Sequence, residues 1–166
     1  SGELSGGPVE IELDTQQALV HLPTDTFRVD LAKDLATELG PPGSGGLVVA
    51  LHLWQRFLTM GPSKYGEVYY LGTAPMRGRD ELVDVLVATH NVAQTWFMFD
   101  PDSGRLLGME MFPEKDVDPC EIYFGDYRIV QNLLVPHRLE VHHGDEIFAV
   151  IRLKEINLPR PAGKET

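Results

Sequence analysis

Strand-like segments follow one another between residues 67 and 156, and the links between them are short. Each segment is apolar or alternates between apolar and polar residues, and each link carries glycine, proline, asparagine or aspartate. The segments are Glu67–Thr73, Glu81–Thr89, Gln94–Phe99, Arg105–Phe112, Glu121–Arg128, Leu133–His142 and Glu146–Ile156. Because consecutive strands with short links pair side by side, the pattern predicts an antiparallel meander.

Shorter strands are predicted closer to the N-terminus, at Val9–Asp14, Ala18–Leu22 and Phe27–Leu31. Apolar and polar residues alternate in the first and the third, which is typical of half-buried strands. Leucines then recur at positions 31, 35 and 39, so we predict a short helix over Leu31–Leu39 that ends at Gly40–Pro41.

A longer amphipathic helix is predicted at Leu47–Met60, ended by Gly61–Pro62. Val48 and Val49 also suit the start of a strand, but the spacing favours a helix. Its apolar stripe consists of Leu47, Ala50, Leu51, Trp54 and Leu58, with Phe57 beside it.

The segment TWFMFDPDSGRLLGMEMF at 95–112 predicts a hairpin that is apolar on both faces. We expect it in the middle of the sheet, where a helix and loops cover one face and neighbouring side chains shield part of the other. The predicted fold class is therefore α+β and mostly β. One large curved antiparallel sheet has its dry, concave face covered by the Leu47–Met60 helix.

With 166 residues, the chain fits one domain, 1–166. Residues 1–8 and 158–166 are expected to be flexible ends. The breaker-rich segment Gly40–Gly46 is a flexible loop or, alternatively, a domain boundary. A net charge of −11 argues against binding to nucleic acid and against electrostatic docking on anionic lipid. The single cysteine, Cys120, permits no internal disulfide, and no apolar run reaches the length of a membrane span.

Motifs in the second half resemble the LolA/RseB-like lipoprotein-localisation superfamily. One is an aromatic strand ending in Phe99–Asp100, followed by a Ser103–Gly104 turn and a strand from Leu106. The other leads from Asp126–Tyr127–Arg128 through LVPHR at 134–138 to a last strand that closes near residue 157. The resemblance covers about residues 47–157.

This resemblance implies an unclosed antiparallel half-barrel with one or two helices over its concave face. It also implies a non-catalytic, periplasmic or otherwise extracytoplasmic module that binds a hydrophobic ligand, such as an acyl chain or a lipoprotein. The family's carriers begin with a helix, whereas this chain begins with strands. The difference favours a domain of a larger envelope protein, whose other domains are then its partners.

A hydrophobic ligand needs an apolar cleft, because each buried methylene contributes about 0.8 kcal/mol. The helix and the 95–112 hairpin supply aromatic and methionine side chains for such a cleft, and methionine adapts to irregular chains. The predicted ligand-binding residues are Leu51, Trp54, Phe57, Met98, Met109 and Met111. The alternative is that they pack on one another, which makes the chain a protein-interaction or sensor domain with a filled core.

Catalytic chemistry has weak support in the sequence. His137 and His142 are an odd number of positions apart on a strand and should face opposite sides, and His143 should diverge from His142. Ser103 fits a turn rather than a nucleophile, and Cys120 has no histidine at a suggestive spacing. We therefore predict no catalytic residue, no metal and no cofactor, with a metal-dependent hydrolase as the third hypothesis.

Overall fold

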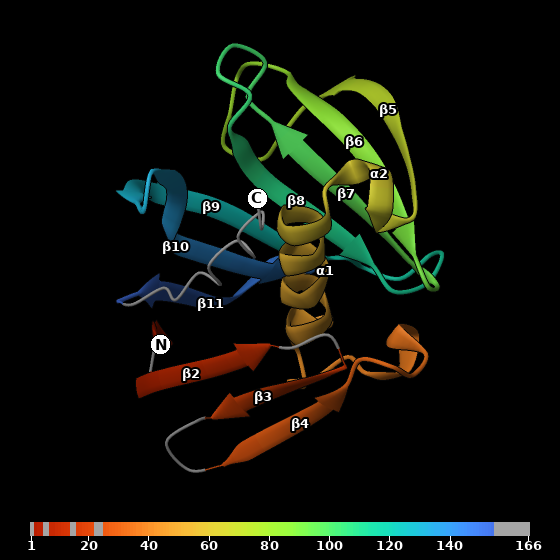
Figure 1. The fold of residues 1–166 in the computed structure, drawn as a ribbon, viewed down its shortest axis with the longest axis vertical. Helices are drawn as coiled ribbons and strands as arrows, with labels where there is room; N and C mark the ends of the chain where they lie inside the picture. Colours follow the sequence, from red (N-terminus) through yellow and green to blue (C-terminus); the bar gives the residue numbers. More distant parts are fainter. Residues whose placement is uncertain (1, 5–6, 14–15, 22–24, 155–166) are drawn as a thin grey trace, which may run out of the picture.

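The computed structural model describes residues 2–4, 7–13, 16–21 and 25–154. In this part of the chain, eleven strands form one antiparallel sheet in the order β4-β3-β2-β1-β11-β10-β9-β8-β7-β6-β5 (Figure 1). The strands are β1 (Gly2–Leu4), β2 (Gly7–Leu13), β3 (Gln17–His21), β4 (Thr26–Asp30), β5 (Glu67–Ala74), β6 (Val83–His90), β7 (Ala93–Phe99), β8 (Leu106–Phe112), β9 (Cys120–Val130), β10 (Leu133–His143) and β11 (Glu146–Leu153). The helices are α1 (Leu47–Met60) and α2 (Pro62–Tyr65), and a 3₁₀ turn spans Leu35–Thr37.

The predicted fold class is confirmed, because the described chain is mostly β, antiparallel and unclosed. Strands β5 to β11 neighbour one another in sequence order, which is the predicted meander. Short β1 pairs with both β11 and β2 and so joins the meander to β2, β3 and β4. Strands β4 and β5 are the two edges of this sheet.

Helix α1 has the predicted bounds and lies across one face of the sheet (Figure 1). We call the face that packs against α1 the inner face and the opposite one the outer face. Residues 47–53 of the helix are buried, and they share one apolar core with inner-face residues such as Phe97, Ile122 and Leu139. Among the described residues, no helix is both long and apolar enough to cross a membrane, in agreement with the prediction.

A second apolar cluster on the outer face explains the two-sided hairpin. It contains Met76, Val83, Val85, Val87, Met98 and Leu107. Met76 comes from the β5–β6 link, which folds over β8 at Gly108. A Cβ added at Gly108 would lie 2.9 Å from Met76 Cε, so the absence of a side chain there lets the link approach. Apolar side chains on both faces of β7 and β8 are thus buried, as the position in mid-sheet predicts.

The segment between β4 and α1 differs from the prediction. Instead of a helix over Leu31–Leu39, one 3₁₀ turn forms at Leu35–Thr37, where the Asp34 carboxylate accepts a hydrogen bond from Ala36 N. The buried Leu31 and Leu35 account for the helical spacing of the leucines. Isolated short helices are marginal in water, so two buried leucines do not suffice to extend this turn.

Parts of the segments that are expected to be flexible are described. Gly2–Leu4 pairs in the sheet as β1, and Gly7 begins β2. In the turn before α1, buried Ser44 Oγ donates to Pro41 O and accepts from the amides of Gly46 and Leu47. This turn therefore provides the polar start of α1. Residues 158–166 lie outside the described residues.

Candidate functional site

The inner face contains five of the six predicted ligand-binding residues. Leu51, Trp54 and Phe57 reach it from α1, and Met109 and Met111 reach it from β8. Met98 lies apart from the other five, because it is buried in the outer-face cluster. It pairs with Val85 and Gly108, and its neighbours Phe97 and Phe99 point to the inner face instead.

These inner-face side chains pack directly on aromatic partners. The Phe57 ring stacks on Phe97 with centroids 4.2 Å apart, and the Trp54 ring lies 4.8 Å from that of Phe124. Met109 and Met111 have no exposed surface. The apolar area proposed for a ligand is therefore covered, to this extent, by the helix itself.

The outer face carries a row of ionisable side chains across three strands. In the register of the sheet, His142 on β10 lies opposite Glu121 on β9, and Glu121 lies opposite Glu110 on β8. All three positions alternate with residues of the inner core, so their side chains lie on the opposite face from α1. The row places two carboxylates directly beside each other.

Hydrogen bonds and ion pairs surround this row. Tyr123 donates its hydroxyl hydrogen to Glu121, and Arg77 Nε lies 3.6 Å from Glu121 Oε2. His142 Nε2 is 2.7 Å from Glu140 Oε1, and Arg138 pairs with the other oxygen of Glu140. Glu140 thus links the imidazole of His142 to the guanidinium of Arg138.

The pKa values of two outer-face glutamates, Glu110 and Glu140, are shifted in opposite directions. Burial, and after it the charge of Glu121, raises the pKa of Glu110 to about 7, while the charge of Arg77 opposes the shift. The pKa of Glu140 is lowered, first by the hydrogen bond with His142 and then by Arg138. Glu110 therefore holds its proton close to neutral pH, whereas Glu140 stays ionised.

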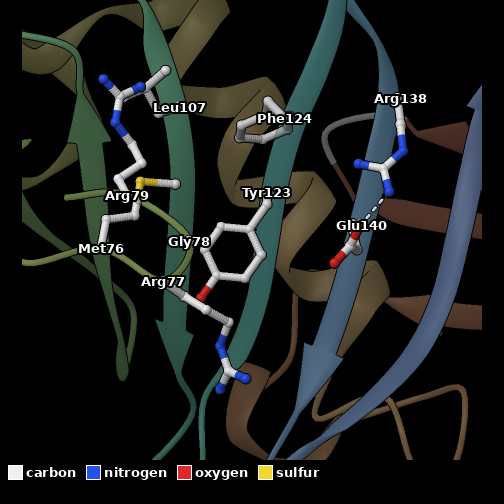
Figure 2. Close-up of a pocket in the computed structure, with 9 residues that line it drawn as sticks. All are labelled: Met76, Arg77, Gly78, Arg79, Leu107, Tyr123, Phe124, Arg138 and Glu140. Carbon is white, nitrogen blue, oxygen red and sulfur yellow. Dashed lines mark hydrogen bonds and ion pairs between the residues drawn. The ribbon is translucent and has the colours of Figure 1, made fainter. Parts of the chain in front are cut away.

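An open cleft of about 390 Å³ lies next to this row, between the β5–β6 link and β10 (Figure 2). Figure 2 shows Tyr123 in the middle, Arg77 and Arg79 on the side of the link, and Arg138 on the side of β10. The lining residues are Met76, Arg77, Gly78, Arg79, Leu107, Tyr123, Phe124, Arg138 and Glu140.

The residues considered for catalysis are dispersed. His142 contacts the outer-face Tyr123 ring, whereas His143 lies against Gly45 in the turn before α1, so the predicted divergence of the two is confirmed. Ser103 donates to Asp100 within its turn, and burial raises the pKa of Cys120 to about 12. Within the described ranges, no group of three or more histidine, cysteine, aspartate or glutamate residues is placed to hold a metal ion.

The sequence reasoning missed the outer-face row. The sequence feature that could have indicated this row is a charged residue in an otherwise apolar strand, Glu110 between Met109 and Met111. Tyr123 and Glu121 alternate in the same way with Ile122 on β9. Only the register shows that these positions meet.

No family model, curated protein or solved structure matches this chain. The resemblance to the LolA/RseB-like superfamily consequently rests on the motifs named above, and the functional argument rests on geometry.

Replacing Glu110 with glutamine should change how stability depends on pH. The fold favours protonated Glu110, so its stabilising contribution is complete below the ordinary pKa of 4.5 and is lost as pH rises through about 7. The stability of Glu110→Gln relative to wild type should therefore rise over this window by about 1–2 kcal/mol, allowing for solvent screening. Urea denaturation at several pH values measures this, with exposed Glu114→Gln as control. Parallel curves for wild type and Glu110→Gln would contradict the assignment.

Proposed function

We propose that this chain is a non-catalytic protein-interaction domain of a larger extracytoplasmic protein, with a half-barrel filled by its own helix. The observation that carries the proposal is the packing of α1 on the inner face, where Phe57 stacks on Phe97. The extracytoplasmic location follows from the family resemblance alone.

The inner face offers an acyl chain little free energy of binding. An acyl chain gains free energy by removing apolar surface from water, about 0.8 kcal/mol for each methylene. Residues such as Leu51 and Met109 are already almost completely removed from water by their neighbours. A ligand that replaced α1 would exchange one apolar contact for another and would expose helix residues, so little driving force remains.

The tip of the β9–β10 hairpin, residues 128–134, is the proposed contact surface. Strand β8 pairs with β9 only at 120–123, and β11 pairs with β10 only at 138–143, so the tip extends past both neighbours (Figure 1). Three large apolar side chains are exposed on it, Ile129 at 76%, Leu133 at 56% and Leu134 at 54%. Because the three lie together on one hairpin tip, they support a contact site there.

The partner proposed for this tip is an apolar surface on another domain of the same larger protein. A membrane suits the tip less well, because a chain with a net charge of −11 is repelled by anionic lipid. A protein surface satisfies apolar side chains without needing basic residues around them.

A second candidate is the binding of an acyl chain after displacement of α1. The unclosed sheet with a helix across one face favours it, since this is the architecture that the family resemblance implies. A titration with a fluorescent fatty acid separates the two candidates.

The filled core predicts that the wild-type chain shows no saturable binding of a fluorescent 16-carbon fatty acid, and that native mass spectrometry finds no co-purified lipid. Saturable binding of the fatty acid would replace the proposal with the second candidate.

The filled core also predicts the effect of a substitution on stability. Phe57→Ala should lower the free energy of unfolding by about 3–5 kcal/mol, because it leaves a cavity against Phe97. Leu58→Ala, at a position 60% exposed on the same helix, should change it by less than about 0.5 kcal/mol.

The proposed contact surface predicts protection of the hairpin tip in the larger protein. Amide hydrogen exchange at residues 128–134 should slow at least about tenfold in the protein that carries this domain, compared with the isolated chain. The triple variant Ile129→Ser, Leu133→Ser, Leu134→Ser should abolish that protection while leaving the exchange of the buried β7 amides unchanged. Equal exchange of the tip in both proteins would refute this surface.

A further inference from the structure

We propose that the outer-face cleft binds a small organic anion, a carboxylate or phosphate group attached to a flat apolar body. This site is separate from the inner face and from the hairpin tip. Its occupancy does not depend on the proposed interaction function.

The cleft follows from the strand pattern of β9. Tyr123 lies on the outer face, so Gly125, two residues later, lies on the same face, opposite Arg138 on β10. Glycine provides no side chain there. A Cβ added at Gly125 would have only Arg138 Cβ within 4.0 Å, so this position is open. Gly125 does not line the cleft itself, but its chain neighbour Phe124 and its cross-strand partner Arg138 do, so it lies at the edge of the cleft.

Guanidinium groups gather around this space, and each lies beside a carboxylate: Arg77 beside Glu121, Arg79 beside Asp100 and Glu81, and Arg138 beside Glu140. Three of the nine lining residues are arginines, although the chain has only 14 basic residues among 166. Arg77 and Arg79 approach from the β5–β6 link, and Arg138 approaches from β10 (Figure 2). The one lining carboxylate, Glu140, is already bound by Arg138 and His142.

The arginines retain donors for a ligand. In the described part of the chain, Arg79 Nε is buried without a hydrogen-bond partner, although another nitrogen of Arg79 lies 3.3 Å from Asp100. The side chain of Arg77 is 49% exposed and its Nε is 3.6 Å from Glu121. A guanidinium has five N–H donors in a planar arrangement, which suits the oxygens of a carboxylate or a phosphate.

Apolar surface lies beside these donors. The side chains of Met76 and Leu107 belong to the buried outer cluster, and the Tyr123 ring packs against that cluster. A flat ring can therefore rest on Tyr123 and Met76 while its anionic group reaches the guanidinium groups. The volume of about 390 Å³ is near the lower end for small-molecule sites.

The test is a titration of the wild-type chain with 1-naphthoate, 1-naphthyl phosphate and the neutral 1-naphthalenemethanol, followed by calorimetry and by NMR shifts of the Tyr123 ring. At least one anionic probe should bind at least about tenfold tighter than the alcohol. The comparison between the two anions identifies which headgroup the site prefers.

Two variants locate the binding. Gly125→Leu places an apolar side chain beside Arg138 at the edge of the cleft and should abolish binding. The circular dichroism spectrum should be unchanged, because the backbone at Gly125 needs no left-handed conformation. Arg77→Gln should weaken binding at least about fivefold, whereas Arg28→Gln, which removes the same charge from exposed β4, should leave it within about twofold. Absence of saturable binding, equal affinity for the alcohol, or binding that persists in Gly125→Leu would overturn the proposal.

Discussion

The packing of α1 against the inner face is the interaction on which the rest of the structure depends. An unclosed sheet of this size has a broad apolar surface that would otherwise be in contact with water. The helix removes it through ring contacts, Phe57 on Phe97 and Trp54 on Phe124, and through leucines and valines in its first two turns. These ring contacts join α1 to β7 and β9, on either side of β8 in the sheet.

This arrangement leaves the ionisable side chains on surfaces other than the inner face. With the inner face covered, ionisable groups gather where the sheet faces away from α1, in the row of Glu110, Glu121 and His142. The β5–β6 link closes over the outer apolar cluster and delivers Arg77 and Arg79 to the rim of the cleft. We therefore propose that this domain binds through its outer face and its loops, while its core is filled.

The sequence was most informative where periodicity is strong. The seven-strand meander and the bounds of α1 could be predicted, because periods of 2.0 and 3.6 and the turn residues agreed along those segments. The helix predicted at Leu31–Leu39 was wrong, because the spacing of leucines reflects burial without any helix. The sequence did not separate Met98 from the five inner-face residues, since a run of apolar residues conceals which ones alternate. The cleft beside Tyr123 and Arg138 could not be predicted, because it depends on cross-strand register rather than on any local pattern.

The most direct test of the account is a nuclear Overhauser measurement on the aromatic side chains in solution. With ring centroids 4.2 Å apart, Phe57 and Phe97 should give strong cross-peaks, and so should Trp54 and Phe124 at 4.8 Å. The amides of residues 48–53 should also be among the slowest to exchange. Absence of these cross-peaks, together with rapid exchange along α1, would show that the helix does not fill the sheet and would contradict the account.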